Sequence, residues 1–426
     1  MTGHASPLKF DVTGINGPRG ADLPLAGLRV LECASFVAGP SGCMALAQLG
    51  ADIIRVDPLG GAADYHRWPV SATNASLYWT ALNKGKRSVA IDFRSLEGRE
   101  LVVALATESS PDAGIVVENN VARPWLSYGA LSERRPDLIQ IHIQGYSDGR
   151  PAVDYTVNAE VGIPDVTGPD GLLRPVNHVL PAWDLLTGMT ATTGLLAALL
   201  RRDRTGAGTN LEIALADVAL AGVASLGWLA EADELGTNRP RQGNYVYGSF
   251  GTDFTTEDGH RVMVVALTDR QWKALRTVTS TEKVFAALEE AMSVDLTVDG
   301  DRYRLREMVT AVLQPWFAAR PFQEVSEKLD QAGVLWSRYR SMTETVSDFR
   351  SGQAVPVLAE LTQPGIGHML SARSPIRLDA AYGDVRVAPQ LGQHTDEVLT
   401  SVLGLNDHQI GQLHDRRVIG AMAAAG

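Results

Sequence analysis

The first 145 residues alternate short apolar runs with amphipathic segments. Residues 28–34 form a β-rich run, a Gly/Pro loop follows at 37–42, and a helical pattern continues to Leu49. Residues 52–57 are strand-like again, and this strand, helix, strand order is typical of a parallel sheet with helices on its faces. The later elements that the pattern predicts are a helix over 96–107, a strand over 114–118, a helix near Leu131 and a strand over 138–145.

The middle of the chain begins with an apolar stretch that predicts a long buried helix over 183–202. The Gly-Ala-Gly segment 206–208 ends this helix, and a strand over 211–215 and a helix over 217–235 follow. Residues 237–251 are rich in Pro, Gly and aromatic side chains, which marks a domain junction or a functional loop.

Beyond this junction the pattern changes to a hairpin over 252–268, turning at Glu257-Asp258-Gly259, and then to helices as far as Gly333. From about Leu335 the chain is expected to return to the first domain and to end in a helical tail over 395–413. The predicted fold is a large open Rossmann-like α/β domain built from both chain ends plus a smaller α+β domain. The expected division is residues 1–215 for the first part of the large domain, 216–250 for a linker helix and loop, 251–335 for the small domain, and 336–426 for the return linker and the rest of the large domain.

Charge and cysteine content narrow the classes of partner. The 38 basic and 49 acidic residues give a net charge of −11, which disfavours nucleic acid or an anionic membrane as the main partner. Cys33 and Cys43 are too few for a disulfide framework or a four-thiolate zinc site, so a reducing cytoplasm is the simplest compartment. Residues 1–22 lack the apolar core of a secretory signal, and the apolar stretch 185–200 is shorter than the ~20 residues of a membrane span.

Common cofactor and metal motifs do not occur in the sequence. The loop over 38–42 lacks the glycine spacing that lets a backbone approach a pyrophosphate, and no Walker loop ending in Gly-Lys-Ser/Thr is found. The nine histidines show no HExxH pattern, and His142, in an apolar strand, is interpreted as a core residue. No Gly-x-Ser-x-Gly elbow presents a serine nucleophile. We therefore expect neither a metal nor a permanently bound cofactor.

Several segments, in order along the chain, together resemble one family of enzymes. They are residues 25–32 (LAGLRVLE), 38–40 (AGP), 47–56 (AQLGADIIRV), 82–88 (LNKGKRS), 92–98 (DFRSLEG), 117–119 (VEN), 204–208 (RTGAG) and 391–399 (LGQHTDEVL). Each match is weak alone, but the ordered set resembles the class III CoA-transferase (CaiB/BaiF) family over nearly the whole chain. The resemblance implies an enzyme that acts on acyl-CoA esters, with coenzyme A as part of the substrate. It also implies an interlocked homodimer in which each chain threads the other.

The family's nucleophile is an aspartate that follows a Gly-rich strand end, and the matching residue here is Asp154 in residues 145–158 (GYSDGRPAVDYTVN). Without the resemblance, an aspartate after a Gly/Pro loop is most often a turn residue or a helix cap. A carboxylate suits the chemistry because it forms a mixed anhydride with the acyl group. The released thiolate can then attack the aspartyl carbonyl, which gives an enzyme thioester and conserves the energy of the original thioester.

By resemblance, the CoA site would be lined by Ala38, Asn83, Lys84, Lys86, Arg87, Asn119, Gln144, Gly145 and Tyr146. Lys86 and Arg87 are candidates for the phosphates, although each taken singly is equally well explained as a solvated charge on a turn. The family's common Asn-Phe-Arg-Pro-Gly is replaced by residues 119–123 (NNVAR), so Arg123 is a further candidate.

Within the family, the residue before the aspartate separates racemases from transferases. Racemases carry a histidine there as an acid/base group, and this chain has Val153, which cannot move a proton. Asp184 matches the racemases' second acid but is also explained as a structural residue at a helix start.

A subgroup that moves CoA between the C1 and C4 carboxyls of mesaconyl-CoA resembles the chain more closely. The segments that carry this resemblance are residues 64–69 (DYHRWP), 153–158 (VDYTVN), 177–184 (NHVLPAWD) and 239–245 (RPRQGNY). Arg241, Gln242 and His178 are candidates to hold the free carboxylate, and Gly243 matches the family's mobile glycine loop. The alternatives are an intermolecular CoA-transferase that uses two acids, and a CoA-binding protein without turnover.

Overall fold

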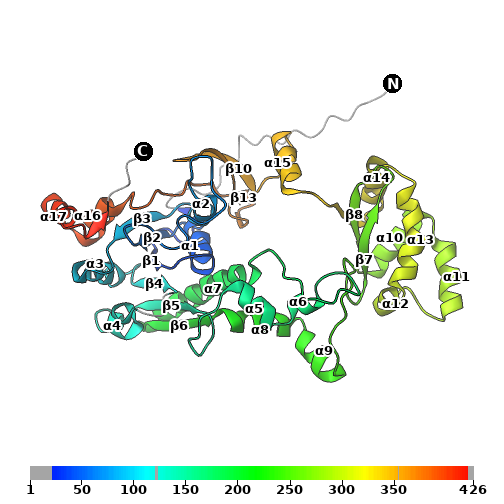
Figure 1. The fold of residues 1–426 in the computed structure, drawn as a ribbon, viewed down its shortest axis with the longest axis horizontal. Coiled ribbons are helices and arrows are strands. Elements are labelled where there is room, and N and C mark those ends of the chain that lie inside the picture. The colour runs from blue at the N-terminus through cyan, green and yellow to red at the C-terminus, as the bar shows by residue number, and fades with distance from the viewer. Residues whose placement is uncertain (1–21, 120–122, 354, 421–426) are drawn as a thin grey trace. The chain divides into compact units, whose positions relative to one another are not determined.

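The computed structural model describes residues 22–119, 123–353 and 355–420, which pack into two units (Figure 1). The larger unit contains the chain as far as residue 161, residues 179–230 and the C-terminal part from residue 355. The smaller unit contains residues 162–178 and 231–353. The N-terminal segment that was expected to carry no secretory signal lies almost wholly outside the described residues. The four-segment domain division expected from the sequence stays a prediction.

A seven-stranded sheet forms the centre of the larger unit, and its order is β14-β3-β2-β1-β4-β5-β6. All neighbouring strands are parallel except β14, which pairs antiparallel with β3. The order reverses between β1 and β4, as in doubly wound α/β folds, and confirms the predicted fold class. The strands are β1 (Arg29–Cys33), β2 (Asp52–Asp57), β3 (Arg87–Ile91), β4 (Ile115–Glu118), β5 (Ile139–Gln144), β6 (Thr209–Ala214) and β14 (Ile419–Gly420).

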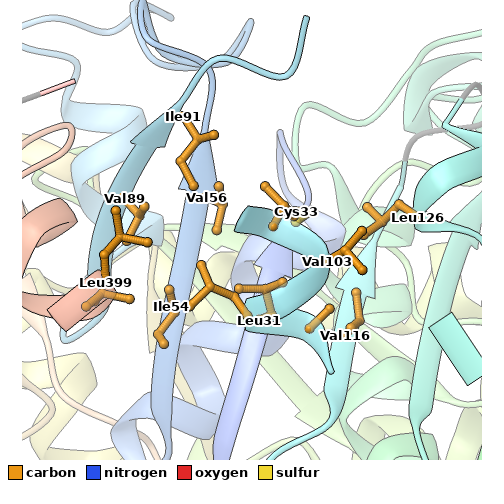
Figure 2. Packing of buried hydrophobic residues seen from close by; sticks show 14 of the residues in the cluster. Leu31, Cys33, Ile54, Val56, Val89, Ile91, Val103, Val116, Leu126 and Leu399 are labelled. Atoms are coloured by element: carbon orange, nitrogen blue, oxygen red, sulfur yellow. The ribbon is translucent and has the colours of Figure 1, made fainter. Parts of the chain in front are cut away.

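The two faces of this sheet are both covered, because successive strand residues point to opposite sides. One face packs on α3 (Leu96–Ala106), α16 (Thr395–Leu403) and α17 (Asp407–Asp415), and Figure 2 shows its buried side chains. In β1, for example, Leu31 and Cys33 lie on that face while Val30 lies on the other. The chain's last helices therefore complete a core that its first hundred residues begin. The helical tail predicted over 395–413 is present as two helices, because the chain breaks at Gly404, where φ is +71°.

The opposite face packs on α1 (Ala38–Gln48) and α7 (Ala182–Thr205), which touch each other closely. A Cβ on Gly188 would lie 2.4 Å from Ser41 Oγ and 2.7 Å from the Ala38 carbonyl oxygen, so only glycine fits there. The sequence predicted a buried helix here, but only 28% of the most apolar window of α7 is buried in the single chain. By length and composition α7 could also cross a membrane, a test that core helices of water-soluble proteins pass as well.

The remaining helices of the larger unit frame the carboxyl ends of the strands. The predicted helix over 217–235 is wrong as a single element, because Gly227 takes a φ of +76° and breaks it in two. Its first part packs on α5 and α7. These elements are α2 (Leu77–Leu82), α4 (Tyr128–Ser132), α5 (Asp154–Glu160) and α8 (Leu215–Ser225), with a short 3₁₀ helix at Pro124–Leu126. The chain passes from the larger to the smaller unit within α9 (Trp228–Leu235).

The smaller unit is an antiparallel three-stranded sheet covered by helices, in the order β7-β8-β9. The predicted hairpin is present and turns at Gly259, where φ is +81°. Trp272 and Phe285 lie at the centre of its core, with ring centroids 4.8 Å apart. Its elements are β7 (Phe250–Thr255), β8 (Arg261–Ala266), β9 (Leu335–Arg338), α10 (Asp269–Thr279), α11 (Glu282–Met292), α12 (Asp299–Arg304), α13 (Arg306–Ala318) and α14 (Phe322–Ala332).

Replacing Phe285 by Ala is expected to destabilise the smaller unit by about 3–5 kcal/mol, because the ring is fully buried and would leave a cavity. Val284, its neighbour on α11, is 50% exposed, so Val284→Ala is the matched control and should change the free energy of unfolding by less than about 1 kcal/mol. Chemical denaturation followed by tryptophan fluorescence measures both. Equal effects of the two substitutions would contradict the described packing.

Candidate active site

A cavity of about 390 Å³ opens at the carboxyl ends of β1, β4 and β5 and at the start of α8. This is the point where the strand order reverses, which is where open α/β sheets bind their ligands. Every residue around it belongs to the larger unit. The lining residues are Ser35, Phe36, Val37, Ala38, Arg67, Tyr78, Asn119, Ile143, Gln144, Gly145, Pro151, Ala152, Val153, Asp154, Tyr155, Pro181, Asp184 and Leu215.

Asp154 lies in the wall of this cavity as the first residue of α5, and only 1% of it is exposed. Its Oδ2 accepts hydrogen bonds from two backbone N–H groups at the start of α7, those of Trp183 at 2.8 Å and Asp184 at 3.1 Å. Its Oδ1 is buried and has no hydrogen-bond partner among the described residues. The carboxylate is therefore anchored through one oxygen and unengaged through the other.

A tight loop between β5 and α5 brings Asp154 to this position. A Cβ on Gly145 would lie 2.2 Å from Ala152 N, so glycine allows the loop to fold back onto the strand end. The loop closes through a hydrogen bond from Tyr146 N to the Arg150 carbonyl oxygen, and Gly145 O accepts one from Ala216 N. The Gly-rich strand end noted in the sequence thus has a steric reason.

Asp184 shares the cavity with Asp154. Burial and the nearby negative charge of Asp154 raise the pKa of Asp184 to about 7, and the positive charge of Arg67 opposes this shift. A carboxyl with this pKa is protonated in a large fraction of molecules near neutral pH. The cavity thus holds two carboxyl groups that resist being ionised together.

The loop that follows β1 forms another wall of the cavity and is held in a strained conformation. Phe36 has a φ of +67°, a region that favours glycine. Its backbone N–H donates to Asp64 Oδ2 at 2.9 Å, and the neighbouring Ser35 exchanges two hydrogen bonds with the Asn119 side chain, at 2.9 and 3.2 Å. Side chains from two other segments therefore fix the position of Phe36.

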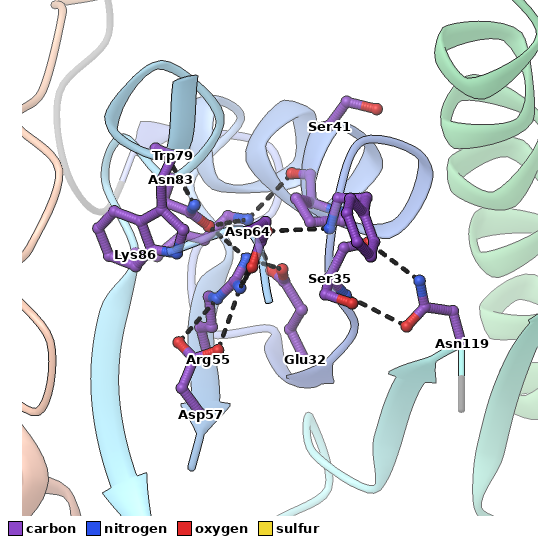
Figure 3. A network of polar contacts seen from close by, with 12 residues as sticks. Glu32, Ser35, Ser41, Arg55, Asp57, Asp64, Trp79, Asn83, Lys86 and Asn119 are labelled. Carbon is purple, nitrogen blue, oxygen red and sulfur yellow. Dashed lines mark hydrogen bonds and ion pairs between the residues drawn. The ribbon is translucent and has the colours of Figure 1, made fainter. Parts of the chain in front are cut away.

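Behind this loop lies a buried network of charges centred on Arg55 (Figure 3). The Arg55 guanidinium contacts Asp57 at 2.9 Å and Asp64 at 3.1 Å. It reaches Glu32 at 3.4 Å, and Glu32 in turn accepts from Lys86 at 2.7 Å. Burial lowers the pKa of Lys86 and raises that of Asp57, and the carboxylates around Arg55 raise its pKa although burial opposes this.

Four of the predicted CoA-binding residues line the cavity together with Asp154, namely Ala38, Asn119, Gln144 and Gly145. The other predicted residues lie elsewhere in the larger unit. Lys86 Nζ contacts Glu32, the Pro40 carbonyl oxygen at 2.9 Å and Asn83 Oδ1 at 2.8 Å. Because an ammonium group has three donors, a phosphate contact by Lys86 would require one of these bonds to break.

The remaining predicted cations also have protein partners. Lys84 Nζ donates to Ser371 Oγ at 3.0 Å and to the Ala372 carbonyl oxygen at 2.9 Å, and burial lowers its pKa. Arg87 pairs with Asp52 and Glu397. Tyr146 Oη donates to Glu160, and Arg123 lies 4.5 Å over the Phe93 ring. Residues 120–122 of the predicted CoA segment lie outside the described residues.

The predicted substrate residues belong to the smaller unit. Arg241 donates to the Thr167 and Arg174 carbonyl oxygens at 3.2 and 2.6 Å and lies 3.6 Å from Asp165. Gly243 has a φ of +59° and donates to the Gly168 carbonyl oxygen, and Gln242 Oε1 is buried without a hydrogen-bond partner among the described residues. His178 is partly buried in the same unit. In the part of the chain that the structure describes, no three His, Cys, Asp or Glu side chains are grouped to hold a metal.

Sequence reasoning missed Arg67, Tyr78, Phe36 and Asp64 as parts of the cavity or its support. Residues 64–69 were one of the segments that distinguish the mesaconyl-CoA subgroup, so the signal was present. The sequence could not show that these residues lie at the cavity, because they reach it only through tertiary packing.

The fold and the sequence together define the class of protein. The family model described as CoA-transferase family III matches residues 25–395, and the chain belongs to this family. The structure of a CAIB/BAIF family protein from Brucella suis superposes with a TM-score of 0.72 at 26% identity, over 89% of this chain and 99% of that one. The predicted family and the prediction of an enzyme are confirmed.

Individual relatives narrow the activity. The chain is 48% identical over 398 residues to the 2-methylfumaryl-CoA isomerase of Chloroflexus aurantiacus. This alignment covers 93% of this chain and 97% of that protein. It is 29% identical over 423 residues to the beta subunit of the succinyl-CoA–L-malate CoA-transferase of the same organism, over 93% and 98%. The protein is therefore an enzyme of the class III CoA-transferase family that acts on CoA thioesters as a CoA transferase or isomerase.

Replacing Arg55 by Met is expected to destabilise the protein by about 3–5 kcal/mol, because Glu32, Asp57 and Asp64 would be left with Lys86 alone. The folded-state pKa of Asp57 is already raised, so folding favours its protonated form, and stability falls as pH rises. The loss should thus be larger at about pH 8 than at about pH 5.5. Thermal and denaturant unfolding at both pH values measure it.

The control for this substitution is Arg94→Met, because the Arg94 side chain is 89% exposed and pairs with Asp92 at the surface. It should change the free energy of unfolding by less than about 1 kcal/mol at either pH. A loss that is independent of pH, or equal in both variants, would show that the buried charges do not stabilise the fold in this way.

Proposed function

We propose that the protein moves CoA from the C1 to the C4 carboxyl of mesaconyl-CoA (2-methylfumaryl-CoA) through covalent intermediates on Asp154. The observation that supports the proposal most directly is the hydrogen bonding of the Asp154 carboxylate. Oδ2 is fixed by two backbone N–H groups, and Oδ1 lacks a hydrogen-bond partner in a cavity at the sheet's ligand-binding edge. An isomerase of this name that is 48% identical supports the choice of substrate.

The reaction begins when Asp154 Oδ1 attacks the thioester carbonyl at C1. The C–S bond breaks, CoA leaves as a thiolate, and a mixed anhydride remains. The thiolate then attacks the aspartyl carbonyl, so mesaconate leaves as a carboxylate and Asp154 carries CoA as a thioester. The C4 carboxylate next attacks this thioester, which forms a second anhydride and frees the thiolate again. Attack of the thiolate at the C4 carbonyl releases the product and restores the Asp154 carboxylate.

The two N–H groups of Trp183 and Asp184 are suited to the steps at the aspartyl carbon. Oδ2 remains the carbonyl oxygen through both anhydrides and the thioester, and it carries negative charge in each tetrahedral state that forms at the aspartyl carbon. Donors at 2.8 and 3.1 Å lie at the distances that stabilise such an oxyanion. The same contacts therefore hold the nucleophile and stabilise its transition states.

Specific observations bear on three alternatives. The 29% identical relative named as a succinyl-CoA–L-malate CoA-transferase favours an intermolecular transfer as the second candidate. A racemase is less favoured because Val153, which precedes Asp154 and is 58% exposed, has no group that moves a proton. A CoA-binding protein without turnover would have no use for an anchored carboxylate with one unengaged oxygen.

The proposed contacts follow the sequence predictions. Ala38, Asn119, Gln144 and Gly145 would lie against the thioester and the pantetheine end of CoA, since they line the cavity with Asp154. Direct phosphate contacts by Lys84, Lys86 and Arg87, contact of Asn83 and Tyr146 with CoA, and the substrate roles of Arg241, Gln242, Gly243 and His178 stay predictions. CoA itself enters as part of the substrate, and we propose no permanently bound cofactor.

We also propose that the enzyme works as a homodimer in the cytoplasm, with neither nucleic acid nor a membrane as a partner. Large apolar side chains are exposed along one stretch of the larger unit, which a second copy would cover. Cys33 and Cys43 are buried and neither forms a disulfide, which fits a reducing compartment. The exposed side chains of α7 to α9 are Leu186, Met189, Leu200, Leu220, Leu226 and Leu229.

Replacing Asp154 by Asn should lower kcat for isomerisation by at least about a thousand-fold, because the amide keeps the shape but is not a nucleophile. The dissociation constant for mesaconyl-CoA should change little. Hydroxylamine added during turnover should modify Asp154, which peptide mass spectrometry detects. The matched control is Asp148→Asn in the same loop, where the side chain is 56% exposed and pairs with Arg150. An Asp154 variant with most of its activity would contradict the covalent mechanism.

Transfer within one diacid molecule predicts that free acids do not enter the product. Retention of mesaconate in the site makes the second attack effectively unimolecular, which favours it over exchange with acids in solution. Labelled mesaconate added during turnover should therefore stay out of the mesaconyl-CoA pool, and succinate or acetate should not accept CoA at a comparable rate. Chromatography with radioactivity detection measures both. Rapid incorporation of label would favour the intermolecular transferase.

A further inference from the structure

The charges around the cavity pose a problem for an anionic substrate. Asp154 and Asp184 both line the cavity, and burial next to Asp154 already raises the pKa of Asp184. A thioester of a dicarboxylic acid brings a third carboxylate into the same space, and like charges at short range repel strongly when water is excluded. Among the described lining residues, Arg67 is the one cation.

Arg67 is placed to meet such a carboxylate. Its guanidinium carbon lies 5.8 Å from the centre of the Phe36 ring and 5.3 Å from that of Tyr78, and both rings line the same cavity. No other described residue accepts a hydrogen bond from the guanidinium or forms an ion pair with it. Its five N–H donors are thus open to a ligand, while two aromatic faces orient its plane.

By contrast, three other cations that could be considered already have partners within the protein. Arg55 and Lys86 neutralise the buried carboxylates behind the cavity wall. Arg241, a candidate from the sequence, donates to two backbone carbonyl oxygens and faces Asp165 within the smaller unit. A new carboxylate would have to displace these partners, whereas at Arg67 it would displace only water.

We propose that Arg67 binds the free carboxylate of the substrate and thereby selects thioesters of dicarboxylic acids over those of monocarboxylic acids. The inference rests on the proposed function and names a residue for it that the sequence did not suggest. Arginine suits this role because its planar fork can hold a carboxylate through two parallel hydrogen bonds.

The same residue explains how the diacid stays in place while CoA is on the enzyme. When CoA has left C1, both ends of the diacid are anionic and one faces the aspartyl thioester. Arg67 holds the opposite end. After the diacid turns, the C4 carboxylate attacks and Arg67 receives the C1 carboxylate, so one cation serves both halves of the reaction.

The test compares two thioesters of similar shape, mesaconyl-CoA and 2-methylcrotonyl-CoA, in which a methyl group replaces the free carboxylate. Arg67→Gln should lower kcat/KM for mesaconyl-CoA about 30- to 100-fold, mainly through KM, because the charged partner of the free carboxylate is removed. With 2-methylcrotonyl-CoA the first turnover leaves CoA on Asp154 as a thioester and frees 2-methylcrotonate, and the rate of that release should change less than about two-fold. Arg67→Lys keeps the charge and should recover part of the loss.

Control variants and a check of folding distinguish the possible outcomes of this comparison. Arg94→Gln removes an exposed charge and should leave both substrates unaffected, and circular dichroism checks that each variant is folded. An equal loss with both thioesters would mean that Arg67 acts through the charge of Asp184, and would overturn the proposal. Unchanged activity of Arg67→Gln with both thioesters would also overturn the proposal. So would a loss of activity with mesaconyl-CoA alone that appears in Arg241→Gln and not in Arg67→Gln.

Calorimetry makes the test independent of turnover. Binding of both thioesters is measured in Asp154→Asn protein, with and without Arg67→Gln. If Arg67→Gln weakens the binding of mesaconyl-CoA but not that of 2-methylcrotonyl-CoA, the inference is supported. If the substitution changes the affinity for both thioesters equally, the inference is overturned. If wild-type protein binds mesaconyl-CoA through Arg67 but does not isomerise it, the proposed function fails while the assignment of the carboxylate site stands.

Discussion

The structure depends on the enclosure of the Arg55 guanidinium by three carboxylates, which ties together three successive segments of the chain. Glu32 comes from β1, Asp57 from β2 itself, and Asp64 from the loop that follows it. None of these groups reaches water, so each charge is stable only because the others are present. Burial raises the pKa of Asp57, the nearby Asp64 and Glu32 add to this shift, and Arg55 opposes it.

This network matters for chemistry because it ends at the cavity. Asp64 joins the Arg55 guanidinium to the backbone of Phe36, whose left-handed conformation would otherwise cost about 1–3 kcal/mol. On the other side, Lys86 donates to a carbonyl in the first turn of α1. The wall that faces the substrate is thereby positioned by buried ions behind it, in the manner of a preorganised site.

In the proposed mechanism, a smaller set of charges inside the cavity controls which acids can enter and react. Asp154 is held as an acceptor by the start of α7, Asp184 has a raised pKa because it is buried beside Asp154, and Arg67 offsets this negative potential. An enzyme for monocarboxylic thioesters would need no such cation. The arrangement of two acids and one arginine therefore relates substrate choice to the same contacts that anchor the nucleophile.

The sequence by itself determined the class of fold, and its resemblance to a known family supplied Asp154 as the candidate nucleophile. Apolar runs near residues 30, 54 and 116 are buried on both faces, and such runs separated by helical segments leave few arrangements other than a parallel sheet. The Gly-rich strand end before Asp154 could be identified because glycine at position 145 is required by a contact within the same loop. Local and periodic signals of this kind need no knowledge of distant segments.

Only the tertiary structure decided which charges are engaged and which are open. Lys86 and Arg67 are both cations on loops in the sequence, yet Lys86 is closed in by Glu32, Asn83 and a carbonyl of α1, while Arg67 faces the cavity. The antiparallel pairing of β14 with β3 likewise joins segments from opposite ends of the chain. The physical reason is that a cation's availability, like a strand's partner, depends on groups brought near by folding, and these lie tens to hundreds of residues away along the chain.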